Sequence, residues 1–279
     1  MSSHLYDLVT YRCSKLTTNL YSTSFSLGTK MLGKEYQMPI YAVYGFVRFA
    51  DEIVDTFHNS NKKELLDRFA NDTYTAIEEK ISLNPILHSF QDTVNKYKIE
   101  KYLIETFLKS MYMDLDKKHY SQEGYEDYIL GSAEVVGLMC LRIFCKGDED
   151  MYQKLKPDAM KLGSAFQKIN FLRDLQADYK VMGRTYFPGL DIKEFDEKNK
   201  KLIEADIQKD FDAGYRGIKQ LPKESRFGVY IAYTYYLELF KKIKHTPASV
   251  ILNQRIRISD AKKYFLFLIC YIKHTFNII

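Results

Sequence analysis

The chain has 279 residues and a formal net charge of +5, with 46% hydrophobic and 28% charged residues. This composition excludes an intrinsically disordered chain, and the mild positive charge, spread along the sequence, argues against a nucleic-acid surface. With 13 Gly and 6 Pro, the sequence favours long helices and disfavours a turn-rich all-β fold.

Apolar residues at helical spacing recur along the chain and predict helix after helix. The predicted helices cover residues 39–57, 62–80, a segment opening at 85, 99–116, 125–144, 150–180, 199–219, 224–245 and 258–275. We expect Pro39 to begin the first helix and Pro157 to kink or break the long one. A loop containing Gly and Pro follows at 181–191. No segment alternates like a strand, so the prediction is one all-α domain over residues 1–279, a helical bundle around a common interior.

The stretch YGFVRFADEIVDTF, from Tyr44 to Phe57, carries two carboxylates one helical turn apart. Asp51 and Asp55 share a helix face with Arg48, and two like charges at this spacing repel by roughly 0.2–0.5 kcal/mol on an exposed helix. The repulsion is larger in an apolar setting, because the local dielectric is lower. The pattern therefore indicates a site at which positive charge binds.

A second acidic face follows in QKINFLRDLQADY, with Arg173 beside it. Its polar residues step along one side of the helix at spacings of three and four: Gln167, Asn170, Asp174 and Asp178. If the two faces met across the bundle, four carboxylates would converge. Such oxygen ligands favour Mg²⁺ or Mn²⁺ shared with substrate phosphates, which Arg48 and Arg173 could bind.

The alternative for either pair is an ordinary solvated helix face. The apolar and aromatic flanks of both pairs favour a functional site, because charges are rarely buried without partners. A different pattern, NDTYTAIEE, places Asn71, Asp72, Thr75 and Glu79 at metal-binding spacing. We interpret it as a solvated face, since it follows the first acidic pair too closely and has Thr73 at its third position.

Three blocks together resemble one known family. YAVYGFVRFADEIVD, YILGSAEVVG and QKINFLRDLQADYKVMGRTYFP are similar, in order and spacing, to the blocks of the trans-isoprenyl squalene/phytoene synthases. The resemblance covers essentially the whole chain. It implies an isoprenoid-synthase-type helical bundle around a central cavity, and the head-to-head joining of two prenyl diphosphates with Mg²⁺.

The resemblance also implies roles for individual residues. Asp51, Asp55, Asp174 and Asp178 match the two acidic motifs, which act in catalysis and, with Asn170, in metal binding. Tyr44 and Tyr128 match catalytic tyrosines, for which the alternative is helix packing. The diphosphate-binding positions are Ser24, Arg48, Gln167, Arg173 and Arg255, with Ser22, Ser26 and Arg257 as near competitors for two of them.

Within this family the likeness favours joining two geranylgeranyl diphosphates through a cyclopropyl diphosphate to phytoene, without NADPH. The alternatives are a squalene or dehydrosqualene synthase acting on two farnesyl diphosphates, and a non-catalytic helical membrane-surface or binding protein. Substrate chain length, double-bond geometry and oligomeric state are not indicated by the sequence.

Four cysteines without a CxxC pair favour a reducing, cytoplasmic compartment. The favoured interpretation of the tail KKYFLFLICYIK is a last core helix, and the alternative, which a lipophilic product suggests, is peripheral contact with the inner surface of a membrane.

Overall fold

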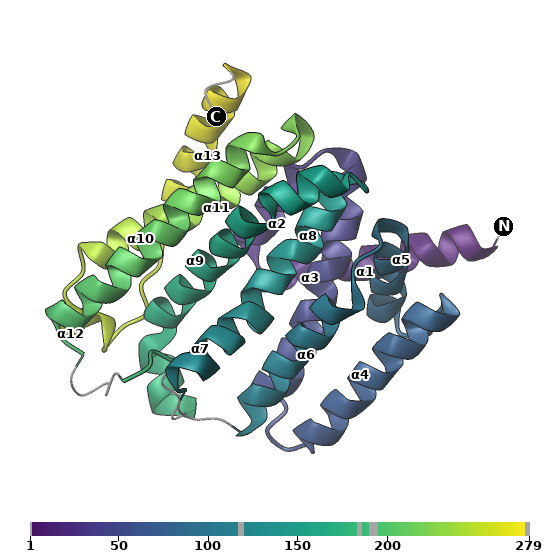
Figure 1. Ribbon diagram of the computed structural model, residues 1–279, viewed down its shortest axis with the longest axis horizontal. Helices are drawn as coiled ribbons and strands as arrows, with labels where there is room; N and C mark the ends of the chain where they lie inside the picture. Colours follow the sequence, from purple (N-terminus) through teal and green to yellow (C-terminus); the bar gives the residue numbers. More distant parts are fainter. Residues whose placement is uncertain (1, 117–119, 183–185, 190–194, 277–279) are drawn as a thin grey trace.

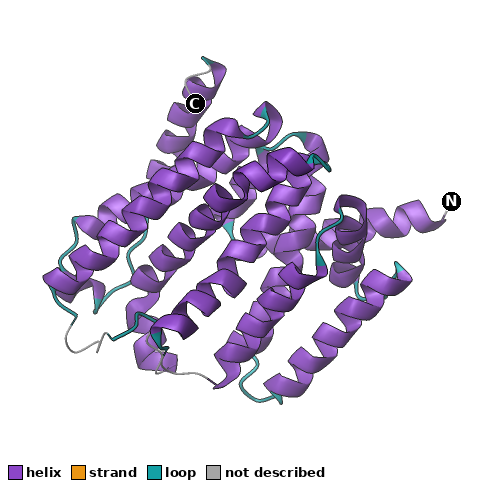
Figure 2. Ribbon diagram, viewed as in Figure 1, coloured by secondary structure: helices purple, strands orange, loops and turns teal. Residues whose placement is uncertain are grey.

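The computed structural model describes residues 2–116, 120–182, 186–189 and 195–276, without the side chains of residues 2, 3, 116 and 177–182. The described residues form helices and loops and contain no strand, which confirms the all-α prediction (Figure 2). The elements are α1 (Ser2–Tyr21), α2 (Thr23–Lys30), α3 (Lys34–Asp55), α4 (Lys62–Glu79), α5 (Pro85–Tyr97), α6 (Lys101–Asp116), α7 (Gln122–Ile129), the π-helical turn η1 (Leu130–Glu134), α8 (Val135–Cys145), α9 (Glu149–Met182), α10 (Glu197–Gln220), α11 (Lys223–Lys244), α12 (Ala248–Ile251) and α13 (Asp260–Thr275).

The helices lie side by side as a bundle, with α1, α2 and α3 behind α6, α8 and α9 in the view of Figure 1. One group of buried apolar side chains joins α3 to α6 and α8, and a second joins α9 to α11 and α13. The two groups flank an apolar pocket that is walled by α2, α3, η1, α8, α9, α10 and α11. The predicted bundle around a central cavity is therefore observed.

Small residues let the helices around η1 approach closely. A Cβ atom on Gly131 would lie 2.6 Å from the Cβ atom of Ser110 and 2.7 Å from the carbonyl oxygen of Thr106, both on α6. On the other side, a Cβ atom on Gly163 of α9 would lie 2.7 Å from the carbonyl oxygen of Ala133. Inserted π-helical turns often occur at functional sites. Here the turn is held between two helices and presents Ala133 to the pocket.

Two details differ from the sequence-based prediction. Pro39 and Pro157 lie inside α3 and α9, so neither begins nor breaks its helix. Pro39 is buried and Pro157 is exposed, and both helices continue because the contacts along the rest of each helix outweigh the backbone hydrogen bond that the proline removes. Helices α1 and α2 were not predicted, because the apolar residues of α1 do not mark its buried face.

One continuous helical run, Gln122–Cys145, is long and apolar enough to span a membrane by length and composition. In this fold 61% of its most apolar window is buried inside the protein, as in the core helix of a globular protein.

Candidate active site

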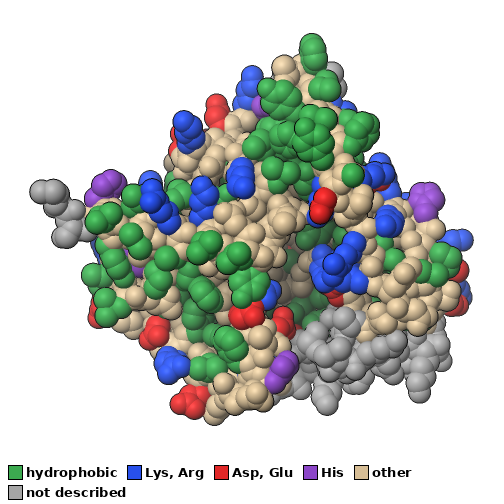
Figure 3. All heavy atoms as spheres, turned by 180° about the vertical axis from the view of Figure 1, so that it is seen from behind, with side chains coloured by type: hydrophobic (Ala, Val, Ile, Leu, Met, Phe, Trp, Pro, Cys, Tyr) green, Lys and Arg blue, Asp and Glu red, His purple; other side chains and the backbone are tan. Residues whose placement is uncertain are grey.

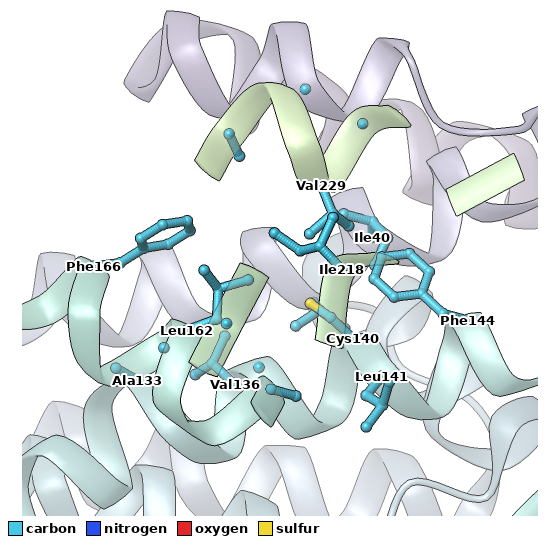
Figure 4. A pocket seen from close by; sticks show the side chains of 18 of the residues that line it. Ile40, Ala133, Val136, Cys140, Leu141, Phe144, Leu162, Phe166, Ile218 and Val229 are labelled. Carbon is cyan, nitrogen blue, oxygen red and sulfur yellow. The ribbon is translucent and has the colours of Figure 1, made fainter. Parts of the chain in front are cut away.

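An apolar pocket of about 290 Å³ runs between the helices of the bundle. In Figure 4, Phe166 and Phe144 lie at opposite ends of the part that is shown, with Leu162, Val136 and Cys140 between them. Ser132 and Phe144 both line it, and twelve residues of helix span roughly 18 Å. The pocket is thus an elongated apolar channel, suited to a chain-like hydrocarbon.

Tyr44 of α3 and Gln167 of α9 line the same pocket. The ring of Tyr44 stacks on Phe25 of α2 with a centroid distance of 4.7 Å. Burial raises the pKa of Tyr44 to about 12, although the charge of Arg48 and the hydroxyl of Ser22 act in the opposite direction. Tyr44 is therefore a neutral aromatic wall at physiological pH, close to the first polar face.

Arg48 lies one turn further along α3 and is half-buried. Its guanidinium pairs with Glu52 and lies 4.3 Å above the centre of the Tyr21 ring. Its buried Nε atom has no hydrogen-bond partner among the described residues. Leaving a buried charged donor unsatisfied costs about 1–3 kcal/mol or more, so this N–H group is suited to an arriving anion.

Asp51 is half-buried on the same face of α3, whereas Asp55 is exposed. Burial, followed by the charge of Asp55, raises the pKa of Asp51 to about 8, and Arg48 offsets only part of this. The charge repulsion expected from the sequence therefore appears as a raised pKa, so that the Asp51 carboxyl keeps its proton at neutral pH. A carboxylate strained in this way is stabilised when a cation binds nearby.

The second face lies on α9, as predicted. Gln167, Asn170 and Asp174 are half-buried, whereas Ile169, Phe171, Leu172 and Leu175 are buried on the other sides of the helix. The amide nitrogen of Asn170 donates to Gln167 at 3.4 Å, and the hydroxyl of Tyr236 donates to the Asn170 Oδ1 atom at 3.3 Å. Asp178 belongs to α9, but its side chain lies outside the described part of the chain.

Asp174 is held by two arginines that the sequence assigned to diphosphate. The Nε atom of Arg173 lies 3.0 Å from the Asp174 Oδ1 atom, and that of Arg255 lies 2.6 Å from the same oxygen. Arg255 thus reaches the second acidic face, and at Arg257 the backbone carbonyl oxygen accepts a hydrogen bond from Lys242 at 2.6 Å. Arg173 and Arg255 thus both pair with the Asp174 carboxylate.

Tyr236 of α11 links the two faces. Its hydroxyl bonds to Asn170 on α9, its ring stacks on Phe166 at 4.0 Å, and it acts electrostatically on Tyr44 of α3. The polar faces of α3 and α9 therefore open at the same end of the apolar pocket.

No cluster of three or more His, Cys, Asp or Glu residues at metal-binding distance occurs among the described residues. The donor set still fits Mg²⁺, because this ion takes only one or two carboxylates and completes its shell with water and substrate phosphates. The oxygen donors on the two faces are the carboxylates of Asp51, Asp55 and Asp174 and the amide of Asn170.

The contacts of Tyr128 identify Asp114 as a site residue that the sequence analysis missed. Its hydroxyl donates to the buried Asp114 carboxylate at 2.7 Å, and burial and this charge raise its pKa well above the ordinary value. Its ring lies in an aromatic cluster with Tyr120, Phe171 and Tyr186. Asp114 also acts electrostatically on Asp51. The only signal for Asp114 in the sequence was an acidic residue between two apolar ones, Met113 and Leu115.

Of the three nearby serines, Ser24 is half-buried in the first turn of α2. Ser22 instead caps that helix by accepting from the backbone N–H of Phe25, and Ser26 donates to Asn19. The acidic pattern on α4 lies in solvent as expected, since Asn71, Asp72, Thr75 and Glu79 are all exposed.

Comparison with known proteins agrees with this geometry. The sequence model of the squalene/phytoene synthase family matches residues 18–262. A phytoene synthase of Arthrospira platensis is 26% identical, with the alignment covering 91% of this chain and 89% of that protein. Phytoene synthase 1 of Solanum lycopersicum is also 26% identical, over 97% of this chain and 68% of its own.

Solved structures show the same fold. A dehydrosqualene synthase in complex with a ligand superposes with a TM-score of 0.80 at 22% identity, covering 96% of this chain and 98% of the other. A squalene synthase from Alicyclobacillus acidocaldarius gives a TM-score of 0.74 at 20% identity, over 84% and 93% of the two chains. The chain therefore has the isoprenoid-synthase helical fold and belongs to the squalene/phytoene synthase family of prenyltransferases.

Proposed function

We propose that this protein joins two geranylgeranyl diphosphates head to head, through a cyclopropyl diphosphate, and releases diphosphate to form phytoene in a Mg²⁺-dependent reaction. The observation that carries the proposal is an elongated apolar pocket lined by Tyr44 and Gln167, which share helix faces with the acidic residues of α3 and α9. Beside it lies a buried arginine N–H group without a partner among the described residues. The phytoene synthases among its relatives support the choice of substrate.

The polar end of the pocket would hold the diphosphate. Asp51, Asp55, Asn170, Asp174 and Asp178 are the residues that would hold Mg²⁺ or Mn²⁺. Bound metal would neutralise charge on the leaving diphosphate and so favour ionisation of the C–O bond.

Arginine side chains complete the proposed diphosphate site. Arg48 offers its unsatisfied Nε donor, and Arg173 and Arg255 can turn from Asp174 to phosphate oxygens when the carboxylate takes a metal. Gln167, which lines the pocket, would add a neutral donor, and Ser24 would add a second one from the first turn of α2.

Departure of diphosphate leaves an allylic cation, and the double bond of the second substrate supplies the electron pair for the new C–C bond. Loss of a proton closes the cyclopropane ring. The second diphosphate then ionises, the ring rearranges and another proton is lost, which gives the hydrocarbon without a reductant. NADPH is therefore not needed.

The aromatic wall protects these cations from water. Tyr44 and Phe25 stack in the pocket wall, and Tyr44 and Tyr128 stay neutral because burial raises their pKa. Their π faces stabilise positive charge, and the apolar channel leaves little room for a water nucleophile. Asp114 positions Tyr128 by accepting its hydroxyl proton in a hydrogen bond.

The test is product identification. Purified protein is incubated with Mg²⁺ and either geranylgeranyl or farnesyl diphosphate, with and without NADPH. We expect a C40 hydrocarbon from the C20 substrate in both conditions. A C30 product from the C15 substrate alone would replace this proposal with a squalene or dehydrosqualene synthase, and no hydrocarbon from either substrate would leave a non-catalytic binding protein.

A further inference from the structure

Helix α1 has its polar and apolar faces reversed relative to an ordinary surface helix. Its inward face carries three fully buried hydroxyl residues, and its outward face carries four exposed aliphatic residues bordered by the exposed Arg12. The buried residues are Thr10, Ser14 and Thr18, and the exposed ones are Leu5, Val9, Leu16 and Leu20. The exposed set falls within about 60° of the helix circumference, roughly opposite the buried set.

The inward face is satisfied without water. The Ser14 and Ser89 hydroxyls lie 2.7 Å apart, and Thr18 donates to the Ser14 carbonyl oxygen at 2.9 Å. A Cβ atom on Gly45 of α3 would lie 2.9 Å from the Ser14 Oγ atom, so the two helices are in close contact. Small residues inside and aliphatic residues outside are the pattern of a helix that faces hydrocarbon.

Helix α13 also exposes an apolar face. Leu266 and Cys270 pack inward. The exposed apolar residues are Tyr264, Phe265, Leu268, Tyr271 and Ile272. They fall within about 120° of the circumference. Exposed Lys262 and Lys273 follow this face along one border.

The two apolar faces lie on one side of the molecule. Figure 3 shows hydrophobic side chains gathered over α13 and over α1, with Lys and Arg side chains between them and a hollow beside them. Further positive charge lies at the end of α13, where Lys223 and Arg226 are close enough to His274 to add to the lowering of its pKa by burial.

Both faces adjoin the polar end of the proposed site. Helix α1 ends at Tyr21, whose ring lies 4.3 Å below the Arg48 guanidinium. Helix α13 begins five residues after Arg255, which reaches Asp174.

We propose that α1 and α13 together dock the protein on a lipid bilayer that carries anionic headgroups. Exposed aliphatic and aromatic side chains enter the headgroup region from two points of one face, and the basic side chains between them meet the negative lipid surface. A net charge of +5 suits this partner. This orientation would also let a hydrocarbon product pass from the site into the lipid, a consequence that rests on the proposed function.

The test uses the full-length protein without substrate, in vesicle flotation. Vesicles of phosphatidylcholine alone are compared with vesicles that also contain phosphatidylglycerol. We expect the wild type to bind, more tightly to the anionic vesicles. Leu16→Gln/Leu20→Gln on α1 and Phe265→Gln/Ile272→Gln on α13 should each lower the partition coefficient roughly tenfold or more.

The matched control is Tyr102→Gln/Leu202→Gln, which also removes two exposed apolar side chains. These residues belong to α6 and α10, outside the two proposed docking helices. The control should bind like the wild type. Equal binding by all variants, or no binding by the wild type, would overturn the proposal.

A second measurement decides whether the apolar faces of α1 and α13 bind a lipid surface or a second copy of the chain. Sedimentation without vesicles should show that the α1 and α13 variants and the wild type share one oligomeric state. A dimer that both variants dissociate, without vesicle binding, would make this face a protein interface and refute the lipid. Because no substrate is present, failure of the proposed reaction would not change these outcomes.

Discussion

In the protein without metal or diphosphate, Asp51 should lower the free energy of unfolding by an amount that depends on pH. Its pKa rises from 3.8 to about 8 in the folded state, through burial and the charge of Asp55. A difference of about 4 units corresponds to about 6 kcal/mol at most, at 1.36 kcal/mol per unit. Because Asp51 keeps partial contact with solvent, which screens the charge, we expect about 2 kcal/mol of this to appear as lost stability.

The sign follows from proton binding. Below about pH 4 both states hold the proton, and Asp51 contributes no strain. Between pH 4 and 8 the folded state holds a proton that the unfolded chain lacks, so stability falls as pH rises. Above the folded pKa of about 8 the loss is complete. Asp51→Asn, which is nearly the same size, should remove this slope.

The assay is urea unfolding of wild type, Asp51→Asn and Asp72→Asn at pH 6 and pH 9, with a chelator present. Asp72 is exposed on α4 and serves as the matched carboxylate control. We expect Asp51→Asn to be the more stable protein at pH 9 by ~2 kcal/mol, while Asp72→Asn follows the wild type. If Asp51→Asn were destabilised at pH 9, Asp51 would be a structural partner of an arginine and the strain argument would be refuted.

Three further predictions concern the site and its frame. Arg48→Lys keeps the charge but loses the planar donor fork, so kcat for hydrocarbon formation should fall roughly tenfold or more, whereas Lys80→Arg should leave it unchanged; equal effects would reduce Arg48 to a charge balance. Mg²⁺ with diphosphate should stabilise the wild type in thermal melts by about 2.7 kcal/mol at 100 times Kd, and Asp55→Asn by much less; equal shifts would remove Asp55 from the site. Gly131→Ala places a Cβ atom 2.6 Å from that of Ser110, so it should cost about 1–3 kcal/mol in urea unfolding, unless η1 can move away from α6.

The helical faces that carry the site could be predicted because their spacing is local. The steps of three and four from Tyr44 to Asp55, and from Gln167 to Asp174, fix which side chains share a face before any packing is known. Where packing between helices decides the local structure, the sequence-based prediction was wrong or made no statement. Helix α1 was missed because its apolar residues face outward, and Pro39 and Pro157 lie within helices whose tertiary contacts outweigh a lost hydrogen bond.

Contacts between distant segments were beyond the sequence. Nothing in the spacing shows that Asp114 on α6 accepts the Tyr128 hydroxyl, or that Arg255 reaches back to Asp174 across 81 positions. Arg48 pairs with Glu52, although the sequence analysis placed Arg48 beside Asp51. Glu52 and Asp51 both lie at helical spacing from Arg48. Only the three-dimensional arrangement decides between them.

The central claim is that the acidic faces of α3 and α9 serve one site. It is tested most directly by kcat/KM for C40 hydrocarbon formation in the wild type, Asp51→Asn, Asp174→Asn and the double variant. We predict that each single change lowers kcat/KM by on the order of 10²-fold or more, and that the double change costs little more than the worse single one, because groups acting as a unit are not additive. Near-wild-type activity of either single variant, or losses that simply multiply, would contradict the account.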